Sequence, residues 1–173
     1  VLPSLDLKRP VTVGAIEQTR DRLVEEGAIP SRIAASIEVE SILAFFEGEL
    51  GARVCDRRHT VWREWPFTFG LPARDAVRSV PVRASPPTPD GVTPNENEIV
   101  VLQGLIDVLV QTPDGMLIID FKTDHVFGDQ IARRVETYRG QVELYARAAA
   151  AIRGGEVREK WLYFLTPRQA VQV

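Results

Sequence analysis

Two apolar segments joined by a tight turn, residues 104–124 (GLIDVLVQTPDGMLIIDFKTD), constrain the fold of this chain more than any other stretch. The TPDG sequence at 112–115 favours a turn, because proline presets one φ angle and glycine accepts an unusual one. We therefore expect a β-hairpin over about residues 98–122. If the strands pair symmetrically about this turn, Gln111 lies opposite Met116.

Charged side chains interrupt both strands of this expected hairpin. Counting outward from the turn places Asp107 opposite Asp120, with their Cβ atoms about 5 Å apart. Lys122 lies two residues beyond Asp120, so its side chain shares that face of the sheet. A one-residue bulge would break this register. The opposite face is uniformly apolar and should pack on a helix; it comprises Val100, Leu102, Ile106, Val108, Val110, Leu117, Ile119 and Phe121.

Two carboxylates that face each other repel, and the repulsion destabilises a hairpin unless something relieves it. A divalent cation between them would do so, and hard oxygen ligands favour Mg²⁺ or Mn²⁺. Such a cation lowers the pKa of bound water and stabilises charge on a phosphoryl group. Lys122 would hold the attacking water or neutralise the transition state. The pattern indicates metal-dependent phosphodiester hydrolysis; the alternative is a salt-bridged cluster on a solvated face.

Composition sets the broad class of the protein. The 173 residues suffice for one domain, and no stretch approaches the ~20 apolar residues of a membrane helix. The net charge of −3 gives no support for nucleic-acid binding, although binding needs only a local basic patch. The single cysteine, Cys55, excludes an internal disulfide and favours a reducing, cytoplasmic location. Val1 stands where an initiator methionine is expected, so we interpret the chain as a fragment of a longer polypeptide.

The first half of the chain predicts helices followed by a strand. Residues 12–26 read as a helix with Thr12 as N-cap and Gly27 as its stop. A second helical region runs from Ser31 to about Leu50 and should end at Gly51. Residues 60–69 read as a strand, which Pro66 places at an edge or a bulge.

The second half adds a loop, a helix and a strand around the hairpin. Residues 81–97 contain many prolines and few bulky apolar side chains, which predicts a flexible surface loop within one domain. A helix is expected from about Gln130 to Ile152, with Asp129 as a possible cap. Residues 157–165 read as the final strand. The arginines of this helix spread around it, so either phosphate contacts by a few or a solvated surface would explain them.

The motifs resemble those of the PD-(D/E)xK nucleases, and specifically their RecB-like branch. That branch has a G-[IL]-[IL]-D strand, a D-[YF]-K-T strand and a helix bearing Q-x-x-x-Y. Here they are GLID at 104–107, DFKT at 120–123 and QVELY at 141–145. REWPF at 63–67 is similar to the family's R-E-x-P-F strand. Order and spacing are most similar to the C-terminal nuclease domains of AddA helicase–nuclease subunits. The resemblance implies an α/β fold with a restriction-endonuclease-like core, a central mixed β-sheet flanked by helices.

The resemblance also implies roles for individual residues. Asp107 and Asp120 would be metal ligands together with the backbone carbonyl of Phe121, and Lys122 would be the catalytic lysine. The remaining site residues would be Gln141 and Tyr145, which share one helix face and would support the site or touch DNA, and Glu64, at an acidic position of the family. Without the motif context, Gln141 and Tyr145 would read as core residues and Glu64 as an exposed strand residue.

The function implied is that of a Mg²⁺- or Mn²⁺-dependent DNA exonuclease domain in a bacterial helicase–nuclease that repairs double-strand breaks. The partners would be DNA, expected as single strands, an attached helicase motor and an AddB-like subunit. The chain has no G-x-x-x-x-G-K-[ST] loop, so ATP hydrolysis would reside elsewhere. The family's metal-binding histidine would precede Val1; His59 and His125 do not match it, although His125 is near enough to Lys122 to approach DNA. The alternative is a non-catalytic module that binds DNA or a partner, with this fragment inactive. A weaker alternative is a metal-dependent phosphatase of small molecules.

Overall fold

A computed structural model describes residues 1–72 and 98–173 of the chain. Within these residues a mixed sheet has the order β1-β2-β3-β4-β5, in which β3 and β4 are parallel and all other neighbours antiparallel. The strands are β1 (Thr60–Pro72), β2 (Ile99–Thr112), β3 (Gly115–Lys122), β4 (Val157–Phe164) and β5 (Gln169–Gln172). The helices are η1 (Leu2–Ser4), α1 (Val13–Glu25), α2 (Ser31–Ala34), α3 (Val39–Glu47), α4 (Glu49–Cys55) and α6 (Asp129–Arg153). This mixed sheet flanked by helices confirms the predicted fold class.

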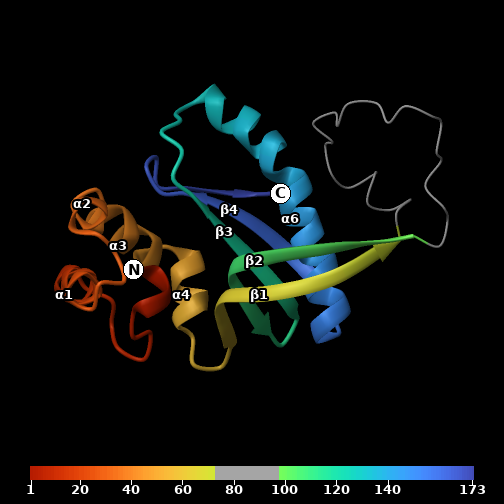
Figure 1. Cartoon of the computed structure of the whole chain (residues 1–173), viewed down its shortest axis with the longest axis horizontal. Helices are drawn as coiled ribbons and strands as arrows, with labels where there is room; N and C mark the ends of the chain where they lie inside the picture. The colour runs from red at the N-terminus through yellow and green to blue at the C-terminus, as the bar shows by residue number, and fades with distance from the viewer. Residues whose placement is uncertain (73–97) are drawn as a thin grey trace.

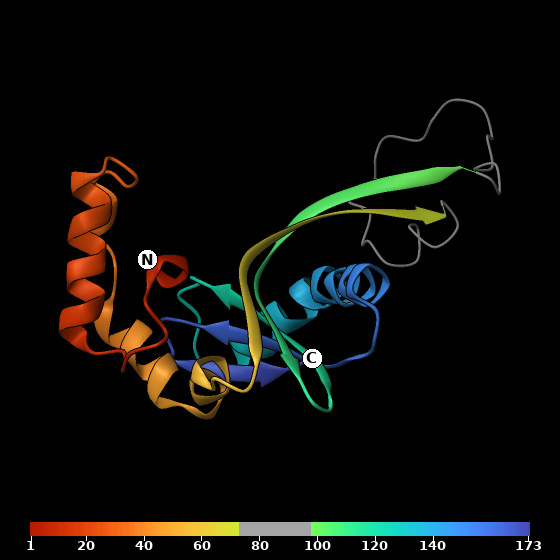
Figure 2. The ribbon, with the colours of Figure 1, turned by 90° about the horizontal axis from the view of Figure 1, so that it is seen from below.

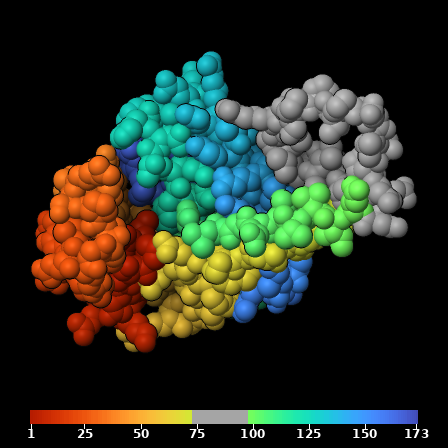
Figure 3. Space-filling view, viewed as in Figure 1, coloured from red at the N-terminus to blue at the C-terminus, as the bar shows by residue number. Residues whose placement is uncertain are grey.

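Helices cover both faces of the sheet (Figure 1). The long helix α6 packs on one face, and α3 and α4 pack on the other, beside η1, α1 and α2. The space-filling view shows these N-terminal helices gathered at one end of the molecule, next to β1 (Figure 3). Strands β1 and β2 continue beyond the rest of the sheet as a two-stranded ribbon (Figure 2). The predicted loop at residues 81–97 lies outside the described residues.

The hairpin has the register that its turn predicts. Thr112 pairs with Gly115, Gln111 with Met116, and the ladder continues to Val108 and Ile119. The Thr112 hydroxyl donates to the Gly115 carbonyl at 2.9 Å and so closes the turn with a side chain.

The expectation that only one face of the hairpin is core was wrong. Val108, Val110, Leu117 and Ile119 do pack against Phe45, Leu50 and Val54 of α3 and α4, as predicted for the apolar face. The opposite face is also buried, because Leu109, Met116 and Ile118 pack under α6. Ile106 joins that second cluster rather than the first. Val100 lies on the projecting ribbon and is exposed. Asp120 and Lys122, in alternation with Ile119 and Phe121, therefore share their face with a second core.

The predicted helical region from Ser31 to Leu50 is three helices, and Gly51 does not end it. The helical conformation is interrupted after Ala34 and after Glu47, and α4 then continues through Gly51 to Cys55. Gly51 serves close packing instead: a Cβ there would lie 2.3 Å from the carbonyl oxygen of Phe45. The periodic apolar pattern was real, but it did not show that the backbone changes direction between α3 and α4.

Two other helix predictions are mostly confirmed. In α1 the Thr12 side chain accepts from the Ala15 N–H at 3.2 Å, and Gly27 follows the helix with φ +70°. Helix α6 spans the predicted range and ends at Gly154, but its N-cap is Gly128. Asp129 lies inside the first turn, where a carboxylate favours the positive end of the helix dipole without capping it.

The remaining strands lie on either side of the β3-α6-β4 unit, with β1 and β2 next to β3 and β5 next to β4. Pro66 lies on β1, which is an edge strand, so its missing N–H leaves the pairing with β2 intact. β4 matches the predicted final strand, and the four-residue strand β5 was not anticipated. In the part of the chain that the structure describes, none of the helices has the length and apolar character needed to cross a membrane.

Candidate active site

The two predicted acidic residues lie where the hairpin ladder ends. Val108 and Ile119 form the last pair, so the next position in register brings Asp107 and Asp120 opposite each other. At this position the Phe121 N–H donates to Oδ2 of Asp107 at 2.8 Å, so a side chain takes the place of a ladder bond. The turn register therefore fixes the position of both carboxylates.

Asp120 is a buried acid in the middle of the core sheet. Its residue exposure is 3%, and Asp120 and Ser41 are the only buried polar or charged residues in the described segments. The Nζ of Lys122 lies 2.6 Å from its Oδ2, which is ion-pair distance. That oxygen is nonetheless a buried atom without a hydrogen-bond partner of acceptable geometry among the described residues, because the ammonium does not approach along a hydrogen-bond direction. An acceptor with this unmet capacity suits a hard cation.

Burial favours the neutral form of both carboxyl groups. It raises the pKa of Asp107, an effect that the Phe121 N–H and the charge of Lys122 oppose. Burial likewise raises the pKa of Asp120; the Lys122 ammonium opposes this, and the charge of Asp107 adds to it. One lysine is therefore not enough positive charge for one buried and one partly buried acid. A bound cation would supply the remainder.

Lys122 is enclosed by groups from β3 and α6. In addition to its contact with Asp120, its ammonium donates to Oε1 of Gln141 at 3.1 Å. It also lies 3.9 Å from the centre of the Tyr138 ring. The Lys122 side chain is 13% exposed. Tyr138 was missed in the sequence, although its spacing of three residues from Gln141 places both on one face of α6.

Gln141 and Tyr145 form the second layer of the site. The Gln141 amide donates to the Tyr145 hydroxyl at 2.6 Å. The Tyr145 ring packs edge-on against Phe67 of β1 with ring centroids 5.5 Å apart. Burial raises the pKa of Tyr145, so this hydroxyl stays neutral. The structure thus brings the two motif residues to Lys122, and their catalytic role stays a prediction.

Glu64 faces Asp107 across the β1–β2 ribbon, although no Cα pair forms there. Arg63 pairs with Val108 and Trp65 with Ile106, so the skipped position is Glu64 opposite Asp107. Glu64 has φ +48°, a left-handed conformation that is strained for this residue type. Glu64 and Asp107 line one cavity of about 200 Å³.

Both strands change faces at this skipped position. Trp62 and Trp65 pack on the α6 side, although residues three apart in a regular strand point to opposite faces. The same holds for their partners Leu109 and Ile106. The local break in alternation accompanies the positive φ of Glu64 and explains why Ile106 left its predicted face.

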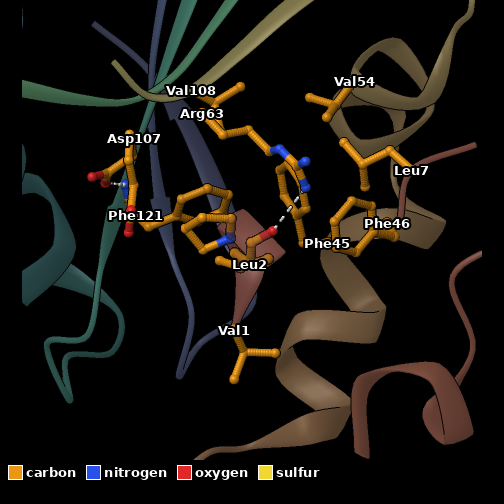
Figure 4. A pocket seen from close by; sticks show the side chains of 12 residues that line it. Val1, Leu2, Leu7, Phe45, Phe46, Val54, Arg63, Asp107, Val108 and Phe121 are labelled. Carbon is orange, nitrogen blue, oxygen red and sulfur yellow. Dashed lines mark hydrogen bonds between the residues drawn. The ribbon is translucent and has the colours of Figure 1, made fainter. Parts of the chain in front are cut away.

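The N-terminal segment closes one side of the cavity. Arg63 donates to the carbonyl of Leu2 at 3.3 Å (Figure 4). It also donates to the carbonyl of Leu5 at 2.6 Å, and the two contacts fix η1 beside β1. Val1 lines the cavity together with Asp107. The histidine predicted to precede Val1 lies outside this sequence and stays a prediction.

The two histidines of the chain have other partners. His59 bonds through Nδ1 to the Arg53 carbonyl at 2.9 Å, next to the end of α4. His125 is exposed and bonds to the Thr166 hydroxyl at 3.2 Å. Neither contact involves Asp107 or Asp120.

The donor set fits a partly hydrated divalent cation rather than a complete protein cage. Within residues 1–72 and 98–173 no group of three or more His, Cys, Asp and Glu side chains is arranged to hold a metal ion. Asp107 and Asp120 supply two carboxylates, and Mg²⁺ is often held by one or two carboxylates with water and phosphate oxygens. The Oδ2 of Asp120, whose hydrogen-bonding capacity is unmet among the described residues, and the raised pKa values of both acids agree with such a site.

Several curated bacterial proteins are similar to this chain over most of its length. The A subunit of the ATP-dependent helicase/nuclease of Moorella thermoacetica is 36% identical over 165 residues, which is 95% of this chain and 11% of that protein. The protein of the same name from Lactiplantibacillus plantarum is 34% identical over 173 residues, 100% of this chain and 13% of that protein. That of Carboxydothermus hydrogenoformans is 32% identical over 172 residues, with 99% and 14% covered. The chain therefore spans only a small part of the length of these relatives.

A comparison with a protein-family model gives the same assignment. The model described as the PD-(D/E)XK nuclease superfamily matches residues 8–172, nearly the whole chain. The match covers the strands of Asp107, Asp120 and Lys122 and the α6 residues that enclose the lysine. It confirms the resemblance inferred from the GLID, DFKT and QVELY motifs. The chain belongs to the PD-(D/E)XK nuclease superfamily.

Proposed function

We propose that residues 1–173 form a single nuclease domain that hydrolyses phosphodiester bonds in DNA with the help of Mg²⁺ or Mn²⁺. The observation that carries this proposal is the buried Oδ2 of Asp120: it forms an ion pair with Lys122 at 2.6 Å, but no described residue donates to it with hydrogen-bond geometry, and Asp120 lies in register with Asp107. Membership of a nuclease superfamily supports the same reaction class.

The proposed cation site consists of Asp107, Asp120 and the backbone carbonyl of Phe121. When bound there, the cation would supply a water of lowered pKa and stabilise negative charge on the phosphoryl group. Asp107 and Asp120 would orient it with two hard oxygen donors, and their own repulsion would fall on binding. The apolar side chains around Ile118 and Ile119 exclude bulk water from one side and strengthen every charge interaction in the site.

Lys122 has the proposed role of holding the attacking water and stabilising the charge that develops in the transition state. Its ammonium is positioned by Asp120 and by Gln141, and Gln141 is in turn held by Tyr145. Glu64 shares the cavity with Asp107 and would bind a water or a second cation there. These assignments rest on geometry and on the family motifs.

The wider function is proposed from the relatives. They are named as one subunit of an ATP-dependent helicase/nuclease, and we propose that this chain belongs to a bacterial protein of that kind. The substrate would be single-stranded DNA delivered by an attached helicase motor, cleaved as an exonuclease during double-strand-break repair in the cytoplasm. An AddB-like subunit would be the partner.

Substitution of Asp120 tests the site. The full-length protein that contains this chain should degrade labelled single-stranded DNA in Mg²⁺ or Mn²⁺, and Asp120→Ala should lower kcat by at least about 100-fold, since several kcal/mol of charge stabilisation is lost. Arg158→Gln, on an exposed part of β4, is the control for substitution alone. Equal rates for wild type and Asp120→Ala would reject the assigned site.

A second candidate function is a non-catalytic module that binds DNA or a partner protein. The observation in its favour is that, among the described residues, no group of three or more His, Cys, Asp and Glu side chains is arranged to hold a metal ion. Calorimetric titration of the chain with Mn²⁺ separates the two candidates. Heat of binding that disappears in Asp120→Asn supports the nuclease, whereas DNA binding without any Mn²⁺ binding supports the module.

A further inference from the structure

The ammonium of Lys122 contacts a third group, the Tyr138 ring, which lies outside the GLID, DFKT and QVELY motifs. An ammonium carries three N–H donors, and here it faces Oδ2 of Asp120, Oε1 of Gln141 and the ring of Tyr138. The Tyr138 ring centre is 3.9 Å from Nζ, within the range of a cation–π contact. Tyr138 and Gln141 are three residues apart on α6, so one helix face presents both groups to the same atom.

Tyr138 is itself fixed by a chain of polar contacts. Its hydroxyl donates to Oδ2 of Asp124 at 2.9 Å. The other oxygen of Asp124 lies 3.1 Å from Nε of Arg134. The Asp124 side chain is 14% exposed, so this contact is protected from solvent. Asp124 follows Lys122 by two residues, and the network therefore ties the end of β3 to the first turns of α6.

The Asp120 carboxylate does not interact with Lys122 exclusively in the proposed site. Asp120 is also a proposed ligand of the cation, so its carboxylate is shared between two positive charges. The amide of Gln141 and the ring of Tyr138 are then the contacts that belong to the lysine. Of these, the ring is the one anchored to a charged pair, Asp124 and Arg134.

We propose that Tyr138 is a positioning residue for Lys122, with Asp124 and Arg134 holding the ring under the ammonium. This inference rests on the proposed nuclease function, in which Lys122 acts on the attacking water. A tyrosine that only filled space against the α6 core would be replaceable by leucine. A tyrosine that positions a cation needs its aromatic face and tolerates phenylalanine.

The test compares Tyr138→Phe with Tyr138→Leu in the full-length protein, using initial rates of Mg²⁺-dependent hydrolysis of labelled single-stranded DNA. Tyr138→Phe keeps the ring but loses the hydrogen bond to Asp124, so it should lower kcat by only about 2- to 3-fold, whereas Tyr138→Leu should lower it by about 10-fold, with KM changed less than about 2-fold in both. Equal kcat values for the two variants would overturn the inference.

A double substitution shows whether Tyr138 acts through the lysine. In a Lys122→Ala background, Tyr138→Leu should change the residual rate by less than about 2-fold, because the group that the ring positions is gone. A further loss of about 10-fold in that background would mean that the ring acts elsewhere. If Lys122→Ala is as active as wild type, the proposed nuclease site itself is wrong. If Lys122→Ala is inactive and Tyr138→Leu is fully active, only the role of Tyr138 is wrong.

The anchor offers a second line of evidence that does not alter the ring. Arg134→Gln and Arg158→Gln remove the same charge from partly exposed ion pairs, but only Arg134 touches Asp124. Asp124→Ala and Arg134→Gln should lower kcat by about 2- to 5-fold without raising KM, and Arg158→Gln should match wild type. If thermal melting shows that Tyr138→Leu does not fold, Asp124→Ala decides: wild-type kcat in that variant would refute the proposed anchor.

Discussion

Asp107 and Asp120 sit in surroundings that favour their protonated forms. Burial raises the pKa of each above the ordinary value of 3.8. Below that value the carboxyl groups are neutral in both the folded and the unfolded chain, and the fold carries no charge penalty. As pH rises from 3.8 through the raised pKa values of the folded chain, the unfolded chain loses these protons first. The free energy of unfolding therefore decreases over this pH range. Without metal, these two carboxyl groups should therefore make the free energy of unfolding smaller at neutral pH than below about pH 4.

Asp107→Asn should make the metal-free chain more stable at pH 7 than wild type. The amide oxygen still accepts the Phe121 N–H, and the charge that burial disfavours is removed. The gain should shrink toward zero as pH falls below about 4, where the wild-type acid is neutral as well. Urea unfolding in EDTA across this pH range measures the difference, and a constant or inverted difference would contradict the assigned burial effect.

At the scale of residues, the sequence predicted the register of the two acids, whereas the residues that surround Lys122 depend on the tertiary structure. Turn chemistry placed Asp107 opposite Asp120, and a period of two placed Lys122 on the face of Asp120, because those rules are local; the period fails at Asp107, where β2 changes faces. The role of Tyr138 depends on how close α6 approaches β3, which no local pattern specifies. The strain at Glu64 arises only when β1 and β2 are paired, so it could not be read from β1 alone.

At the scale of elements, β2 and α6 meet closely at Gly104. A Cβ at this position would lie 2.6 Å from the Phe67 ring and 3.2 Å from the Tyr145 ring. The glycine of the GLID motif therefore lets the Phe67 ring lie over β2 and lets Tyr145 reach Gln141. Its requirement comes from close packing rather than from an unusual φ angle.

Gly104→Ala should destabilise the chain by about 1–3 kcal/mol, the usual effect of overpacking, and should lower nuclease activity by displacing Tyr145. Urea unfolding and the single-stranded DNA assay measure the two effects. Gly14→Ala in α1 is the matched control, since nothing lies within 4 Å of its added Cβ and alanine favours a helix. Equal stability changes for both substitutions would contradict the close approach at Gly104.

The prediction of one helical region from Ser31 to Leu50, where the structure has three helices, was wrong at the scale of elements. Helical spacing of apolar residues continued across α2, α3 and α4, and it correctly predicted helix over most of the range. Between α3 and α4 the interruption is at Gly48, which adopts an extended conformation with φ −83° and ψ 172°. Gly51 then packs against the Phe45 backbone, and Phe45 in turn packs on Phe121 and Tyr163.

For the whole molecule, the site lies at the junction of the sheet with two separate cores. One core lies under α6 and the other under α3 and α4, and Asp120 stands on the strand shared by both. A ligand bound at Asp120 would therefore stabilise the complete fold and not one loop. The family motifs predicted this architecture well, whereas β5 was too short and too polar to be detected.

Mn²⁺ should raise the melting temperature of the chain, because a cation that binds only the folded state stabilises it. At 100 times the Kd the stabilisation is about 2.7 kcal/mol. Asp120→Asn should abolish the rise, and differential scanning calorimetry with and without EDTA measures both proteins. An identical Mn²⁺-dependent rise in Asp120→Asn would place the bound ion elsewhere.

The change of faces along β1 and β2 has a consequence for recognising distant homologues. Trp62 and Trp65 straddle Glu64, while their partners Leu109 and Ile106 straddle Asp107. Each strand thus carries an apolar-x-x-apolar step around an acid, out of phase with ordinary β alternation. Sequence searches that assume strict two-residue alternation along β1 and β2 would misalign the residues on one side of Glu64 and Asp107. A profile that permits one phase slip at the acid in both strands would align the ribbon throughout.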